Sequence, residues 1–253
     1  MKTNRIVAAR GFTLVELLVV IVIIAALAGL SAPMIMRQVK KADLTEGINN
    51  ARQISLALNQ FEQDYGSFPD DETAIAVKDN NDNAIVSGSS ANDRFRQLIR
   101  ANTIDSETVF YCKTSYTKKP DNNMQNDKAL DKGEVGFGII MTADNRGLST
   151  SGSSARPILA APFTAIGVST RKPLFDSDAY LGKGVVLKMD GSVSQETIAP
   201  TTKALKLNGK DILKDGEGTV WGPGSPVQFA YPAARGGGGS TTTTNPSTER
   251  PTL

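Results

Sequence analysis

The 253-residue sequence lacks histidine, has one cysteine and one tryptophan, and carries little net charge. Without histidine, the chain has neither the most frequent general base of enzymes nor a major metal ligand. A single cysteine, Cys112, cannot close a disulfide within the chain. The net charge is +2, and residues 1–10 hold three basic side chains, so residues 11–253 sum to −1. This balance gives no reason to expect a nucleic-acid partner.

Catalytic and cofactor-binding motifs are also absent from the sequence. There is no nucleophile elbow, no phosphate-binding loop and no Cys or His spacing of a zinc site. Aspartates in loops offer oxygen atoms, but they are scattered and lack the alternate spacing and closing glutamate of a calcium loop. These aspartates are Asp144, Asp176, Asp178 and Asp190. We therefore expect a protein that is not an enzyme, with no cofactor and no metal site.

A basic leader and a long apolar run open the chain. Residues 1–10 contain three basic side chains and no acidic one, whereas residues 17–32 contain no charge. Extended back to Phe12, the run has one charged residue, Glu16, and is long enough to cross a bilayer as a helix. Basic residues beside a span stay in the cytoplasm, so the rest of the chain is expected outside it. An ordinary secretory signal peptide, cleaved at the small residues 25–29, is the alternative.

Glu16 argues against that alternative. A carboxylate within a membrane span is costly and usually has a partner, unless it reaches the interface. Cleavage after Gly11 would create a cation at this depth, the α-amine of Phe12. That amine cannot easily reach Glu16 of its own helix, but the amine of a neighbouring copy, shifted along the axis, could. The charge pattern therefore predicts self-assembly.

Residues 10–17, Arg-Gly-Phe-Thr-Leu-Val-Glu-Leu, resemble the processing motif of type IV pilins and type II secretion pseudopilins. The resemblance covers about the first 70 residues and includes Pro33 just after the span. It implies that a prepilin peptidase cuts between Gly11 and Phe12, that Phe12 becomes N-methylated, and that Glu16 is the assembly residue. It also implies an inner-membrane assembly platform, other copies of the chain and membrane lipid as partners. Major pseudopilins of this family bind Ca²⁺ in a C-terminal loop.

A second helical pattern follows the apolar run. Apolar residues recur at steps of three and four, which marks one stripe of a helix. Tyr65-Gly66, with Pro69 just beyond, is a typical helix end. We predict a helix over residues 12–65, with a membrane span at 12–32 and an amphipathic half at 33–65. The stripe consists of Leu44, Ile48, Ala51, Ile54, Leu58, Phe61 and Tyr65.

Residues 66–235 are predicted to form a globular, β-rich domain. It begins with a polar insert at 70–92 and a short helix at 94–101, and a loop covers 114–133. Hairpin turns are expected at Asp190-Gly191, as a two-residue turn, and at Asn208-Gly209. Strands are expected at 107–113, 135–142, 157–161, 184–189 and 192–198. Cys112 lies in the first of these and is expected in the core, with pairing between molecules as the alternative.

The last segment, residues 236–253, is Gly- and Thr-rich and is predicted to be disordered. With the leader at 1–11, the sequence indicates an α+β fold, in which a long N-terminal transmembrane helix packs on a small antiparallel β-sheet. The expected function is that of a structural subunit of a type II secretion pseudopilus, in the inner membrane and then in a periplasmic or surface filament. A type IV pilus subunit for adhesion, motility or DNA uptake, or a monomeric membrane-anchored binding module, is the alternative.

Overall fold

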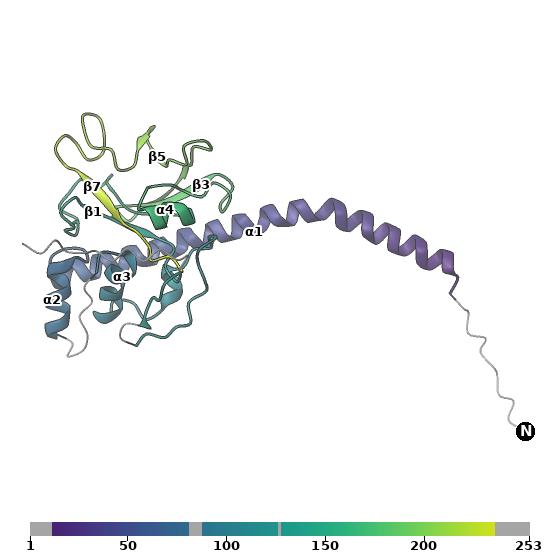
Figure 1. Cartoon of the computed structure of the whole chain (residues 1–253), viewed down its shortest axis with the longest axis horizontal. Coiled ribbons are helices and arrows are strands. Elements are labelled where there is room, and N and C mark those ends of the chain that lie inside the picture. The colour runs from purple at the N-terminus through teal and green to yellow at the C-terminus, as the bar shows by residue number, and fades with distance from the viewer. Residues whose placement is uncertain (1–11, 81–87, 126–127, 236–253) are drawn as a thin grey trace, which may run out of the picture. The chain divides into compact units, whose positions relative to one another are not determined.

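The computed structural model describes residues 12–80, 88–125 and 128–235 (Figure 1). The chain divides into two compact units, Met1–Ala42 and Asp43–Leu253. The long helix α1 (Leu14–Tyr65) contributes to both, and the predicted helix over 12–65 is confirmed. The predicted leader at 1–11, with Gly11, and the predicted tail at 236–253 lie outside the described residues.

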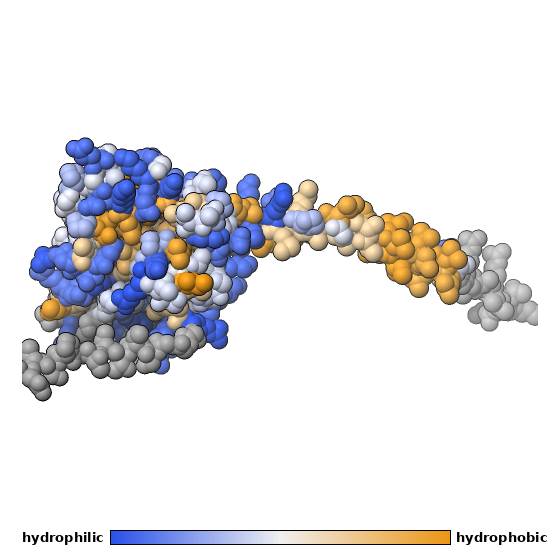
Figure 2. Space-filling model, turned by 45° about the horizontal axis from the view of Figure 1, so that its top comes forward, coloured by the Kyte–Doolittle hydropathy of each residue, from blue (hydrophilic) through white to orange (hydrophobic). Residues whose placement is uncertain are grey.

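In the first unit, α1 buries no side chain between Leu14 and Val39. Pro33 lies inside the helix, and the surface up to that point consists almost entirely of Leu, Val, Ile and Ala side chains (Figure 2). By length and composition, α1 can cross a membrane. An exposed apolar surface of this length is unfavourable in water and suits a lipid environment.

In the second unit, α1 buries the stripe that the sequence predicts. Ile54, Leu58 and Phe61 are completely buried, and Leu44 and Ala51 are buried as well. The helix ends at Tyr65, where Gly66 takes a φ of +86° that glycine adopts at low cost. The stripe is therefore the part of α1 that holds the globular unit together.

A five-stranded antiparallel sheet packs with this stripe in one apolar core. The strand order is β4-β3-β2-β1-β7, and the sheet lies to one side of the C-terminal part of α1 (Figure 1). Its strands are β1 (Gly138–Thr142), β2 (Pro157–Ala161), β3 (Lys183–Lys188), β4 (Val193–Thr197) and β7 (Val227–Ala230). Strands β1 to β4 confirm the four predictions from residue 135 onward. Strand β7 was not predicted, because its four residues follow a run of glycine and proline without a hairpin partner nearby in the sequence.

Two of the predicted local structures are corrected by the structure, and one helix is added. The polar insert 70–92 contains a helix, α2 (Asp71–Asn80), because Oδ1 of Asp70 accepts the backbone N–H groups of Glu72 and Thr73 at 2.9 and 2.8 Å. The helix expected at 94–101 is α3 (Ala91–Arg100), since Ser90 and Asp93 form a capping box that starts it earlier. A further short helix, α4 (Ala165–Thr170), lies between β2 and β3.

The strand predicted at 107–113 is wrong. A 3₁₀ helix, η1 (Glu107–Phe110), takes its place and continues into irregular chain. The Asn50 side chain of α1 donates to the backbone oxygens of Thr108 and Tyr111 at 3.3 and 3.0 Å, which occupies acceptors that a strand would use. The apolar character of the segment reflects burial against α1, which sequence periodicity cannot distinguish from a strand.

The two predicted hairpins are present, and one has a different turn. The N–H of Gly191 donates to the oxygen of Lys188 at 3.0 Å, and Lys188 in turn donates to Ser192 at 2.9 Å. Since only Gly191 has a positive φ, the loop has three residues, with a glycine bulge, and is not the two-residue turn predicted. Strands β5 (Lys206–Leu207) and β6 (Lys210–Asp211) flank Asn208-Gly209 as predicted.

We predict that a chain without residues 1–36 is soluble and folded, and that Leu58→Asp unfolds it. An unpaired buried charge costs several kcal/mol, against a total stability of about 5–15 kcal/mol. Leu56→Asp is the matched control, because Leu56 lies on the same helix and is 71% exposed. Thermal unfolding followed by circular dichroism measures both variants. If Leu58→Asp melted like Leu56→Asp, the stripe would not be the support of the core.

Candidate functional site

The first candidate site is the N-terminal end of α1, where Phe12 and Glu16 lie. Phe12 is 74% exposed. Oε2 of Glu16 accepts the backbone N–H of Thr13 at 2.8 Å and the Thr13 hydroxyl at 2.6 Å. The N–H of Glu16 donates back to Oγ1 of Thr13 at 3.2 Å. These bonds form a capping box, in which a side chain at each end satisfies a backbone donor that the helix leaves free.

Sequence reasoning missed the role of Thr13, although the spacing Thr-x-x-Glu before an apolar run is the signal of such a cap. The cap uses only one carboxylate oxygen. Within the described part of the chain, Oε1 of Glu16 accepts no hydrogen bond and Glu16 forms no ion pair. The site thus presents a carboxylate that is held in place by Thr13 at the start of an apolar helix and forms no ion pair within the described residues.

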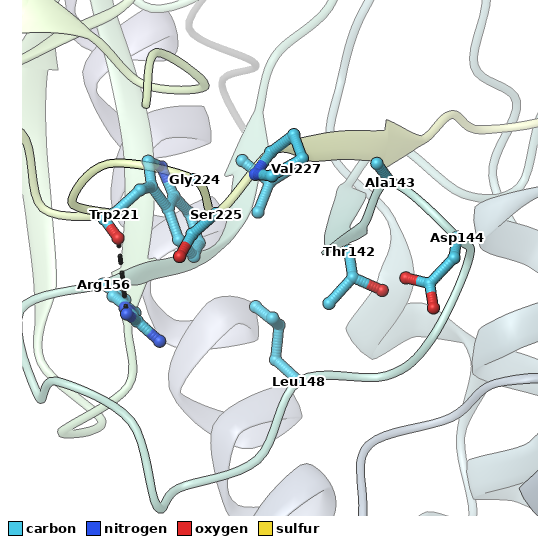
Figure 3. A pocket seen from close by; sticks show the side chains of 10 residues that line it. Thr142, Ala143, Asp144, Leu148, Arg156, Trp221, Gly224, Ser225 and Val227 are labelled. Carbon is cyan, nitrogen blue, oxygen red and sulfur yellow. Dashed lines mark hydrogen bonds between the residues drawn. The ribbon is translucent and has the colours of Figure 1, made fainter. Parts of the chain in front are cut away.

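A pocket of about 450 Å³ lies in the globular unit beside the end of β1 (Figure 3). Leu148, Trp221 and Val227 form apolar parts of its lining, and Asp144 and Arg156 are its charged residues. The Arg156 guanidinium lies 5.6 Å from the centre of the Trp221 ring and donates to the Trp221 backbone oxygen at 3.4 Å. The lining offers a small binding surface, but no pair of side chains arranged to activate a nucleophile.

Cys112 is buried, as predicted for a core residue. Burial raises the pKa of its thiol to about 12. A thiol of this kind is inert, because the thiolate is the form that reacts. Gly136 faces it so closely that a Cβ atom on this glycine would collide with the cysteine sulfur, so the chain here is tightly packed.

The acidic residues that lie close together in the structure are not the aspartates considered in the sequence. Asp144, Asp178 and Asp190 are exposed, and the structure does not bring the four scattered aspartates together with one another. Instead, Glu107, Asp121 and Glu134 each place one carboxylate oxygen within 4.8 Å of the others. Sequence reasoning missed this cluster, because its members are far apart in a region that reads as an apolar run and a polar loop.

A comparison with protein families matches the N-terminal region of the chain. Residues 7–32 match the family model described as a prokaryotic N-terminal methylation motif. Relatives of the chain include three proteins named type II secretion system core protein G. The one from Pectobacterium carotovorum is 36% identical over 66 residues, which is 26% of this chain and 42% of the relative. The one from Escherichia coli K12 is 29% identical over 136 residues, 53% of this chain and 80% of the relative.

The third, from Klebsiella pneumoniae, is 34% identical over 87 residues, 34% of this chain and 57% of the relative. The matched parts thus span less than two thirds of the Pectobacterium and Klebsiella proteins. No solved structure matches the chain significantly. The family model, over residues 7–32, covers the part of the chain that holds the capped glutamate and the apolar first part of α1.

We predict that Cys112 does not react with a thiol reagent such as DTNB at pH 8 in the folded protein. With a pKa of about 12, roughly one thiol in ten thousand is ionised at that pH. The same reagent should titrate one thiol in guanidinium chloride, which is the internal control. Fast modification of the native protein, or a disulfide-linked dimer on a non-reducing gel, would show that Cys112 is accessible for pairing between molecules.

Proposed function

Because the chain belongs to the type IV pilin and pseudopilin family, we propose that it is a structural subunit of a type II secretion pseudopilus. The observation that carries the proposal is the N-terminal motif, with its carboxylate held at the start of an exposed apolar helix. The names of the three relatives favour type II secretion over a type IV pilus.

In this proposal the chain is processed before it assembles. A prepilin peptidase cuts between Gly11 and Phe12 and methylates the new amine of Phe12. Residues 12–32 hold the subunit in the inner membrane, with the globular unit outside the cytoplasm. An inner-membrane assembly platform then lifts the subunit into a filament, where other copies replace lipid around the apolar helix.

Glu16 selects the position of the neighbouring copy. A carboxylate in a hydrocarbon environment is stabilised by a cation more strongly than in water, since the local dielectric constant is low. The capping bonds from Thr13 fix Oε2, and the second oxygen, Oε1, remains available to the Phe12 amine of a neighbour. One charge pair per subunit thereby sets the axial shift between copies, while apolar packing supplies contact area.

We predict that the native protein begins at Phe12 with a methylated amine, and that Gly11→Val keeps the leader attached. A valine side chain at the cleavage position blocks the close approach that glycine permits. Gly29→Val is the matched control, since nothing lies within 4 Å of a Cβ atom at Gly29. Intact mass measurement and N-terminal sequencing determine the first residue of both variants. A native N-terminus created by cleavage after Ala28 or Gly29, with processing blocked by Gly29→Val, would establish an ordinary secreted protein.

We predict that Glu16→Gln inserts at normal levels but fails to assemble, whereas Thr13→Ala still assembles. Glutamine can replace glutamate in a capping box but carries no charge, and Thr13→Ala weakens the cap but leaves the carboxylate. Crosslinking in whole cells would show multimer ladders for the wild type and Thr13→Ala only. Unchanged ladders in Glu16→Gln would favour a monomeric membrane-anchored module. Equal losses in both variants would assign the effect to the helix cap.

A further inference from the structure

Two buried glutamates lie together in the globular unit, in the stretch of chain between α3 and β1. Glu107 opens η1 and Glu134 lies just before β1, and both are completely buried. Asp121, which is exposed, completes a group whose three carboxylate oxygens lie within 4.8 Å of one another. Buried carboxylates usually have partners that compensate their charge, because desolvation strongly disfavours an isolated one.

The described partners of the two glutamates compensate their charge only in part. Oε1 of Glu107 accepts the N–H of Leu130 at 2.6 Å, but its Oε2 is buried and accepts no hydrogen bond in the part of the chain that the structure describes. Oε2 of Glu134 accepts the N–H of Asp131 at 2.6 Å. The Nζ of Lys118 lies 3.1 Å from Oε1 of Glu134, without the geometry of a hydrogen bond.

The charges of this cluster leave a deficit of two positive charges. Three ionised carboxylates contribute −3 and Lys118 contributes +1, so the cluster carries −2 when Glu107 is ionised. Burial is the main cause that raises the pKa of Glu107, and the charges of Glu134 and Asp121 raise it further. The N–H of Leu130, and that of Asn122 without a complete hydrogen bond, favour the charged form.

The geometry and the charge deficit suit one kind of ligand. Ca²⁺ takes carboxylate and carbonyl oxygens at about 2.3–2.6 Å, so oxygens on opposite sides of the ion are about 5 Å apart. The separation of up to 4.8 Å within the cluster agrees with this. We propose that Glu107, Asp121 and Glu134 form a binding site for a hard divalent cation such as Ca²⁺. Asp121 lies at the surface and provides the route by which the ion enters.

Helix α3 holds the loop behind this site in place. The Asn92 side chain, 1% exposed, donates to the oxygens of Leu130 and Asp131 at 2.8 and 3.0 Å. Arg96 donates to the oxygens of Ala129 and Leu130 at 2.6 and 3.1 Å. These bonds fix the backbone N–H groups that orient Glu107 and Glu134, in the way that outer partners orient the ligands of metal sites.

The site differs from the calcium loop of the resembled family, which lies in the C-terminal part of those proteins. It also departs from the sequence-based expectation of no metal site. That expectation was based on the spacing of four aspartates, none of which belongs to this cluster. An alternative without metal exists for the same geometry. Glu107 keeps a proton and shares it with Glu134, as close carboxyl pairs do.

The test uses the full chain in detergent micelles, stripped with EDTA and then titrated with CaCl₂. Unfolding is followed by the fluorescence of the single tryptophan, Trp221, which is 2% exposed. We expect CaCl₂ to raise the melting temperature of the wild type by several degrees when it is in large excess over its Kd. Glu107→Gln should abolish the rise, and Asp121→Asn should reduce it. The exposed control variant, Asp178→Asn, should respond like the wild type.

A wild type that does not respond to CaCl₂ would overturn the proposal, as would a Glu107→Gln variant that responds normally.

Discussion

Burial of one stripe of α1 is the interaction on which the globular unit depends. Ile54, Leu58 and Phe61 lie in the core that the sheet completes, and each contributes about 1.5–3 kcal/mol when it leaves water. Asn50 on the same helix holds the chain around η1. The first part of α1 has no such partner among residues 12–80, 88–125 and 128–235, and it exposes apolar side chains throughout. The side chains of α1 therefore suit its two halves to different environments. The first half suits lipid, and the second half suits the core of the globular unit.

Much of this fold could be predicted from local sequence patterns. The stripe of α1, its end at Gly66 and strands β1 to β4 follow from periodicity and turn residues. Predictions failed where distant contacts decide the local structure. η1 reads as a strand, but Asn50 of α1 occupies its carbonyl oxygens. β7 is recognisable only through its pairing with β1, which lies 85 residues earlier at Thr142 and Val227.

The two candidate sites also differ in whether the sequence could identify them. Glu16 could be identified from sequence, since a lone carboxylate in an apolar run is conspicuous, and Thr13 three residues earlier carries a recognised capping signal. The cluster of Glu107, Asp121 and Glu134 could not, because it forms only when the loop between η1 and β1 folds back onto α3. No spacing rule covers ligands that come from a turn, a loop and a short helix in three separate places.

In the proposed processing, the position of the cut also decides whether the charge of Glu16 stays available to a neighbouring copy. A cut after Gly11 leaves the peptide bond between Phe12 and Thr13 intact, so the Thr13 N–H remains the amide that binds Glu16 at 2.8 Å. A cut one bond later would turn that nitrogen into a charged amine already beside its own carboxylate. Each chain would then neutralise itself and offer its neighbours neither charge. If the proposed processing occurs, the choice of one peptide bond therefore separates a chain whose Glu16 charge is open to a neighbour from one whose charges are paired within the same molecule.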